Sequence, residues 1–96
     1  MERTQFESRI RQQGYAEVIE RDMAANVVNK AHAHEFDAQL LILEGEITIV
    51  RAGTSQTYRP GDTCEVPAGT EHEERVGHEG VRYLAARRHQ VAARSA

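Results

Sequence analysis

Turn-forming residues interrupt the second half of this chain at short intervals, and this spacing limits the folds that it can adopt. Glycine, proline and aspartate favour the backbone angles of tight turns. Five such sites follow residue 43: Glu44-Gly45-Glu46, Ala52-Gly53, Pro60-Gly61-Asp62, Pro67-Ala68-Gly69 and Gly77-His78-Glu79-Gly80. The runs between them are short, so the spacing predicts an antiparallel β-sandwich or β-barrel.

The segments between the turns have the composition of β-strands. Residues 40–43 are continuously apolar and residues 47–50 are rich in β-branched side chains, so both are expected to be buried strands. The other expected strands cover residues 15–21, 27–28, 56–59, 63–66, 72–76 and 81–87. The predicted fold class is therefore all-β.

One short helix is expected near the N-terminus, over about residues 5–13. Thr4 and Glu7 fit a capping box, and two apolar residues follow at helical spacing. Gly14 is expected to end the helix, because glycine readily adopts the left-handed conformation found after helices.

Length and charge restrict the classes of protein further. A chain of 96 residues has room for one compact core, so a single domain is expected over residues 1–96. The net charge of -3 argues against a nucleic-acid-binding protein, which would present a basic face. The longest apolar run, at residues 40–43, is far shorter than the roughly 20 residues that cross a bilayer. Neither nucleic acid nor a membrane is an expected partner.

Three features bear on surface contacts and location. Cys64 is the single cysteine and cannot form an internal disulfide. The first residues lack the apolar stretch of a secretory signal, so the cytoplasm is the expected location. The C-terminal stretch carries arginines that predict a solvated edge or a subunit contact, with anion binding as the alternative. These arginines are Arg82, Arg87, Arg88 and Arg94.

His32 and His34 form an H-x-H pair in a segment expected to be extended. Residues two apart in a strand project from the same face, which would place the two imidazoles side by side. Neutral imidazole is the commonest protein ligand for zinc, iron, nickel and copper. The pair alone is a weak signal, because two surface histidines beside Glu35 would give the same pattern.

Two segments resemble the motifs of the cupin superfamily. Residues 32–45 begin with H-x-H and close on a glycine, as the first cupin motif does. The second motif, P-G-x5-P-x-G-x-x-H, is matched without a gap by Pro60, Gly61, Pro67, Gly69 and His72.

This resemblance implies a small RmlC-like cupin barrel, which is a jelly roll or double-stranded β-helix, with its core motifs at residues 32–76. It also implies that His72 points inward towards His32 and His34, so that three imidazoles hold one divalent metal ion. A barrel this small has exposed edges, and cupins often pair, so a homodimer is expected.

The chain departs from the cupin pattern at one ligand position. Aligned through Gly45, the position where many cupins carry a glutamate ligand is Ala38, which cannot bind metal. A slip or bulge in the strand would turn Gln39 or Asp37 inward as a fourth ligand; otherwise water or substrate completes the site. Val76 stands where many relatives have an asparagine.

A site with three nitrogen ligands is typical of a catalytic metal ion and not of a closed structural one, because water or substrate must occupy the remaining coordination positions. The metal is expected to be iron, zinc, nickel or manganese. The resemblance implies a dioxygenase, isomerase or lyase acting on a small polar metabolite such as a carbohydrate or keto acid. The alternatives are a non-catalytic module that binds a metal or small ligand for sensing or storage, and a structural protein with vestigial histidines. No catalytic acid or base stands out, so the sequence does not decide whether the chain is an enzyme.

The remaining polar and aromatic residues are expected to have structural roles. Cys64 lies in a strand segment and is predicted to be a small core residue. The two tyrosines are predicted to contribute aromatic packing. The two histidines are predicted to lie outside the barrel, and the three glutamates are predicted to face solvent. These residues are Tyr58 and Tyr83, His78 and His89, and Glu71, Glu73 and Glu74.

Overall fold

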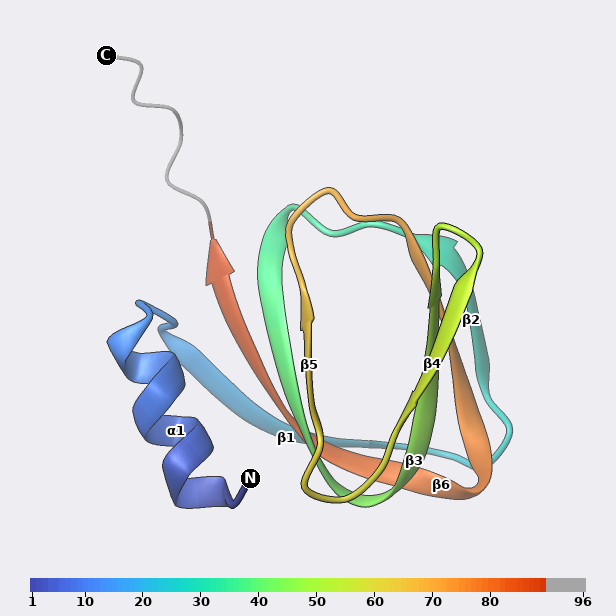
Figure 1. Ribbon diagram of the computed structural model, residues 1–96, viewed down its shortest axis with the longest axis horizontal. Helices are drawn as coiled ribbons and strands as arrows, with labels where there is room; N and C mark the ends of the chain where they lie inside the picture. Colours follow the sequence, from blue (N-terminus) through green and yellow to red (C-terminus); the bar gives the residue numbers. More distant parts are fainter. Residues whose placement is uncertain (90–96) are drawn as a thin grey trace.

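The computed structural model describes residues 1–89, which form one helix and six strands (Figure 1). Arg94 of the basic stretch lies outside the described residues. The elements are α1 (Arg3–Gln12), β1 (Glu17–Met23), β2 (Val28–His32), β3 (Phe36–Arg51), β4 (Thr54–Tyr58), β5 (Thr63–Val66) and β6 (His72–His89). The all-β prediction with a short N-terminal helix is confirmed.

Two long strands, β3 and β6, form the frame of the barrel. They run antiparallel from the pair Phe36 and His89 to the pair Val50 and Glu73. β1 and β2 pair with different halves of β6, and β4 and β5 pair with different halves of β3. All these pairings are antiparallel, and the sheet curls into a barrel (Figure 1).

Both frame strands continue through a site where the sequence predicts a turn. The predictions of turns at residues 44–46 and 77–80 are wrong, because β3 and β6 bend there without ending. Gly45 and Gly80 have positive φ angles of 76° and 80°. A Cβ atom on Gly45 would lie 1.9 Å from the carbonyl oxygen of Gly80, so glycine lets the two bent strands approach each other.

The bends also change which residues face inward. The pairing register of β3 with β6 shifts between Ile42 and Glu44 and again between Gly45 and Ile47. Ile42 and Ile47 both belong to the barrel core although they are an odd number of residues apart. The first shift leaves one residue of β3 unpaired, and such a β-bulge turns the following side chains to the other face. The second shift leaves one residue of β3 opposite four of β6.

Apolar side chains fill the barrel from several strands. Leu40 and Ile42 from β3 meet Tyr83 and Ala85 from β6 in this cluster, and Cys64 lies in it as predicted. A second cluster lies on the outer side of β3 and β6. There Phe6 and Ile10 of α1, both fully buried, cover the outward-facing side chains. The burial of these large apolar groups holds the helix on the barrel.

The helix begins earlier than its predicted cap. Glu2 is the N-cap, and its backbone N–H donates to Oε1 of Gln5 at 3.2 Å. The prediction that Thr4 caps the helix is therefore wrong, since Thr4 lies within the first turn. Gly14 follows the helix with a φ angle of 86°, as expected for a glycine after the last turn.

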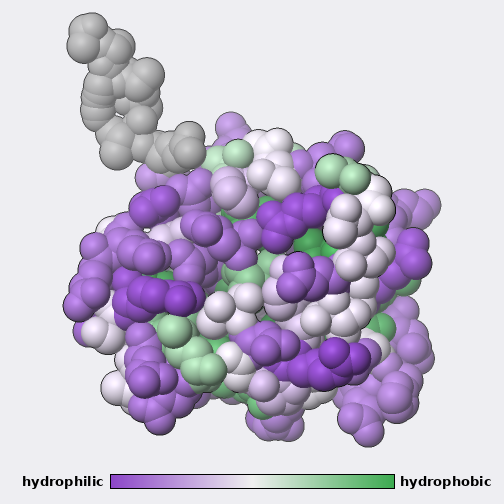
Figure 2. All heavy atoms as spheres, viewed as in Figure 1, coloured by the Kyte–Doolittle hydropathy of each residue, from purple (hydrophilic) through white to green (hydrophobic). Residues whose placement is uncertain are grey.

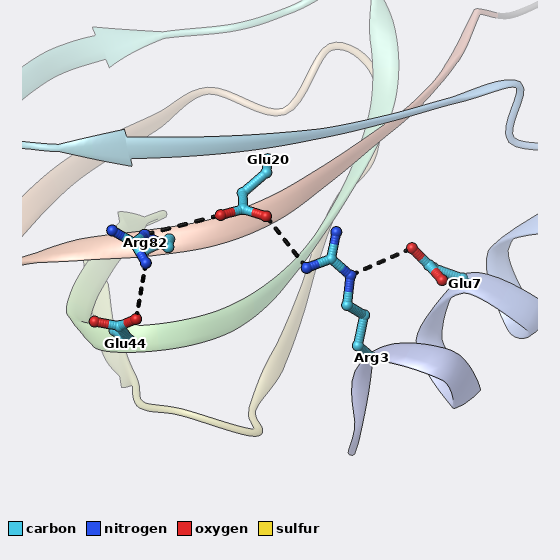
Figure 3. A network of polar contacts seen from close by, with 5 residues as sticks. All are labelled: Arg3, Glu7, Glu20, Glu44 and Arg82. Carbon is cyan, nitrogen blue, oxygen red and sulfur yellow. Dashed lines mark hydrogen bonds and ion pairs between the residues drawn. The ribbon is translucent and has the colours of Figure 1, made fainter.

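Polar side chains cover most of the face seen in Figure 2. On the outside of the barrel, Arg82 pairs with Glu44 and Glu20, and Glu20 pairs with Arg3 of α1 (Figure 3). Arg88 pairs with Asp37 at 2.8 Å. Two arginines of the basic stretch, Arg82 and Arg88, therefore form ion pairs with other residues on the outside of the barrel. No helix in residues 1–89 has the length and apolar character needed to cross a membrane.

Candidate metal centre

Three histidines from separate parts of the chain meet at one point. His32 is the last residue of β2, His34 follows it in the connection to β3, and His72 begins β6 directly opposite His32. Their ring centres are 4.5 to 5.4 Å apart. One nitrogen from each ring lies within 4.8 Å of the other two, so the group could hold a metal ion.

Backbone carbonyls orient two of the three rings. His32 Nδ1 lies 2.7 Å from the carbonyl oxygen of Lys30, and His72 Nδ1 lies 3.0 Å from that of Thr70. A carbonyl oxygen only accepts hydrogen bonds, so Nδ1 donates in both rings and Nε2 keeps its lone pair. Metal-bound histidines use this arrangement, in which the outer N–H fixes the tautomer and the ring direction.

The surroundings of His34 favour its neutral form. Partial burial lowers the pKa of His34, and the neighbouring imidazoles of His32 and His72 lower it further. A metal ligand must be deprotonated at the nitrogen that binds, so this shift suits the role. The three residues thus fit a borderline metal such as zinc, nickel or iron(II) in donor type and spacing.

The histidines line a cavity of about 660 Å³ inside the barrel. Its walls combine apolar side chains of the core with polar groups, and among them are Ala38, Leu40, Tyr83, Asn29 and Glu74. A volume of this size is typical of pockets that take small molecules.

Comparison with known proteins agrees with this architecture. The family model of the cupin domain matches residues 20–87, which is most of the chain. This chain is a cupin. No curated protein matches it.

Solved structures with the same fold include enzymes and proteins without a stated activity. A cupin superfamily protein from Desulfitobacterium hafniense DCB-2 has a TM-score of 0.66 and 19% identity, over 79% of this chain and 81% of that one. DMSP lyase DddQ from Ruegeria pomeroyi DSS-3 has a TM-score of 0.69 and 23% identity, over 79% of this cupin but only 39% of the lyase. KdgF from Halomonas sp. has a TM-score of 0.62 and 21% identity, over 76% and 69% of the two chains. At these identities the likeness extends to the fold alone.

Gln39 and Asp37, the fourth-ligand candidates of this cupin, lie on the outer side of β3. Gln39 is buried, and its amide bonds to the side chains of Arg9, Gln13 and Tyr15 next to α1. Asp37 accepts hydrogen bonds from Arg88 and from the backbone N–H of Ala68. The structure does not bring either residue to the histidines, because β3 has no bulge before Ile42 and keeps Ala38 inward.

Glu74 is the functional candidate that the sequence reading missed. The prediction that Glu74 faces solvent together with Glu71 and Glu73 is wrong, because its side chain is only 17% exposed and lines the cavity. Its Oε2 lies 3.4 Å from His72 Nε2, and its Oε1 accepts a hydrogen bond from Asn29 at 2.8 Å. The signal was present, because residues 72 and 74 of one strand share a face.

The cavity of this cupin also presents two arginines. Arg21 lies opposite Tyr83 in the pairing of β1 with β6, and Arg87 lies on the same inward-facing row of β6 as Tyr83. The guanidinium carbon of Arg87 is 4.5 Å from the ring centre of Phe36, which stacks on His34 at 4.7 Å. Within residues 1–89, neither arginine forms an ion pair.

The acidic residues beside Arg21 also line the cavity, although they alternate with it along β1. Glu20 alternates with Arg21 along β1 and pairs with Arg3 and Arg82 on the outside of the barrel (Figure 3). Asp22 lies opposite Arg82, on the same outer side as Glu20. Glu17 lies directly opposite Arg87 in this pairing, so acidic residues stand near both arginines without forming an ion pair to either in the part of the chain that the structure describes.

The other residues singled out in the sequence lie apart from the histidines. Burial raises the pKa of Cys64, in agreement with a core thiol, and raises that of Tyr58 beside it. His89 contacts Phe36 at the far end of β6, and His78 lies in a shallow hollow with Arg59. Tyr83 packs in the core, as predicted, but it also lines the cavity.

Proposed function

We propose that this cupin binds one divalent metal ion through His32, His34 and His72 and acts on a small polar metabolite held beside it. The convergence of the three imidazoles carries the proposal, because His32 and His72 are already held by backbone carbonyls with Nε2 available. When bound, an ion with open positions supplies Lewis-acid activation of an oxygen-containing ligand, a more acidic bound water, or dioxygen chemistry. Iron, zinc, nickel and manganese fit this role.

Two arginines at the cavity, together with a bound divalent cation, support an anionic ligand although acidic residues also line it. The exposed Arg21 and the half-buried Arg87 line the cavity without an ion pair in residues 1–89, and Tyr83 lies directly opposite Arg21 on β6. Burial raises the pKa of Tyr83, and the Glu74 carboxylate raises it further. The hydroxyl therefore stays protonated and able to donate a hydrogen bond. A carboxylate, such as that of a keto acid or a uronate, is the ligand group that such donors bind best.

A dioxygenase, isomerase or lyase reaction is the activity we propose for this site, in keeping with its open metal positions. A non-catalytic binding or sensing module is the second candidate, and one observation favours it. Close to the histidines, one oxygen of the Glu74 carboxylate accepts a hydrogen bond from Asn29 and the other lies 3.4 Å from His72, so no acid or base without such contacts is evident there in the described part of the chain.

Metal content is the first test of this function. The chain is purified without a histidine tag, and its bound metals are measured by elemental analysis alongside a His32→Ala/His72→Ala variant. One equivalent of metal in the parent and none in the variant is expected. Equal metal in both, or none in either, would contradict the proposed site. Turnover on a panel of sugars, uronates, keto acids and diketones then separates the enzyme from the binding module.

We further propose that residues 1–96 form one domain, that the protein works in the cytoplasm, and that it forms a homodimer. β1 lies at an edge of the sheet, and its Val18 and Ile19 are 41% and 38% exposed, which supports pairing of two copies along that edge. Light scattering coupled to gel filtration measures the mass directly. A mass of one chain at micromolar concentration would contradict the dimer.

A further inference from the structure

The position of Glu74 connects it to the three histidines. It lies two residues after His72 on β6, so both side chains project into the barrel. Across the sheet it pairs with Asn29 of β2 and with Ile49 of β3, whose side chain belongs to the barrel core. It lines the same cavity as all three histidines.

The contacts of His72 leave its Nε2 atom facing a carboxylate oxygen of Glu74. The Nδ1 atom donates to the carbonyl oxygen of Thr70, so a neutral His72 has only a lone pair at Nε2. A carboxylate oxygen of Glu74 lies 3.4 Å from that atom, and it too is an acceptor. A positive charge at this point satisfies both atoms, either as a proton on Nε2, which makes the contact an ion pair, or as a metal ion that both atoms bind.

We infer that Glu74 is the fourth protein ligand of the metal ion, in place of the carboxylate that this cupin lacks at Ala38. The inference depends on the three-histidine site proposed above. Metal–nitrogen and metal–oxygen bonds of about 2.1 Å at a tetrahedral angle separate two donor atoms by about 3.4 Å. The observed separation of His72 Nε2 and Glu74 Oε2 has this value. The donor atoms that lie within 4.8 Å of one another belong to the three histidines alone, so the carboxylate would turn towards His32 and His34 when the ion binds.

Ala38 and Glu74 line the same cavity from different strands, β3 and β6. Moving the carboxylate to β6 keeps a donor set of three nitrogens and one oxygen and still offsets one positive charge of a divalent ion. It also leaves the wall at Ala38 free of a bulky side chain. That wall is then open to the ligand.

Asn29 is the positioning residue for Glu74 in this arrangement. Its Nδ2 donates to Oε1 of Glu74 at 2.8 Å, which leaves Oε2 directed at His72. Hydrogen bonds of this kind fix the direction of a ligating carboxylate, and their loss typically weakens metal binding by about 10- to 100-fold.

The test compares metal affinity and ligand field in the tag-free protein and its variants. Glu74→Gln keeps the shape of the side chain, and Glu74→Ala removes it. Glu73→Gln is the matched control, because Glu73 is the adjacent acid, projects from the other face and pairs with Arg75. Zinc affinity is measured by competition with a chromophoric chelator, and cobalt(II) absorption reports the number and charge of the ligands. Circular dichroism of the metal-free variants checks that each one folds.

We expect both Glu74 variants to bind zinc at least about 10- to 100-fold more weakly than the parent and to change the cobalt bands. The Glu73→Gln control should match the parent in both measurements. An affinity within twofold of the parent, with an unchanged cobalt spectrum, would overturn the role of Glu74 while leaving the three-histidine site intact. Absence of metal binding in the parent itself would overturn both proposals.

Discussion

Asp37 and Arg88 are paired across β3 and β6 on the outer side of the barrel. Nη2 and Nε of Arg88 both donate to Oδ2 of Asp37, at 2.8 and 3.1 Å, and this contact raises the pKa of Arg88. The other carboxylate oxygen accepts from the backbone N–H of Ala68, in the turn that leads to His72. One buried acid thus ties the end of β6 to the turn that precedes His72, one of the three proposed metal ligands.

Replacement of Asp37 by asparagine should destabilise the fold. Asp37 is only 6% exposed, and the charge-assisted hydrogen bonds to Arg88 would be lost. We expect a loss of about 1–3 kcal/mol in the free energy of unfolding, as measured by urea denaturation. Glu35→Gln is a suitable control, because Glu35 is exposed on the neighbouring connection. A loss below about 0.5 kcal/mol, the usual range for surface substitutions, would show that the pair contributes little.

Gly45→Ala should be among the most damaging single substitutions in the barrel. The methyl group would collide with the carbonyl oxygen of Gly80, and the backbone has a positive φ angle. We expect destabilisation of about 3 kcal/mol or more, because the collision adds to a conformational cost of about 1–2 kcal/mol.

Gly53→Ala isolates the conformational part of that cost. Gly53 has almost the same φ angle, 77°, but no atom lies within 4 Å of the added methyl group. Only the smaller loss of about 1–2 kcal/mol is expected in thermal or urea unfolding. Equal losses at Gly45 and Gly53 would mean that β3 and β6 separate easily at their bend.

Metal binding should stabilise the protein against heat. A ligand that binds only the folded state at 100 times its dissociation constant adds about 2.7 kcal/mol. For a domain of this size, this corresponds to a rise in Tm of about 10 to 20 °C. The rise should be absent in His34→Ala, whose ring is one of the three that converge. A rise of the same size in that variant would place the metal elsewhere.

Cys64 should resist alkylation in the folded protein. The thiol is 4% exposed, and burial raises its pKa, so the reactive thiolate is scarce at neutral pH. We expect labelling by iodoacetamide to be slow at pH 7 and to become complete after unfolding in guanidinium, as followed by mass spectrometry. Rapid labelling without denaturant would contradict the core position of this residue.

Arg87→Gln should remove a preference for anionic ligands. In the metal-loaded parent, a keto acid such as pyruvate should raise Tm more than diacetyl, a neutral diketone. Loss of a charge-assisted contact corresponds to about 10- to 100-fold in affinity, so the difference should largely disappear in the variant. Arg75→Gln is the control, because Arg75 is exposed and pairs with Glu73. Equal binding of both ligands by the parent would argue against an anion site.

Much of the site was predictable because its signals are local. The turn residues at Pro60, Gly61 and Gly69 and the three histidines stand in a spacing that resembles both cupin motifs, and the structure brings the histidines together. The short apolar and β-branched runs likewise identified most strands. Such features depend on backbone preferences and on side-chain alternation over a few residues, which a sequence displays directly.

The inward side of the long strands was decided only by the tertiary structure. The bends at Gly45 and Gly80 change the alternation, so counting from His72 would turn Arg87 outward, whereas the pairing of β6 with β1 and β3 turns it into the cavity. The sequence predicts that Glu74 belongs to an exposed acidic run, whereas the pairing of β2 with β6 places Asn29 opposite it and within hydrogen-bond distance. Which face a strand buries depends on its partners and on bulges between them, and these contacts join residues that are far apart in the sequence.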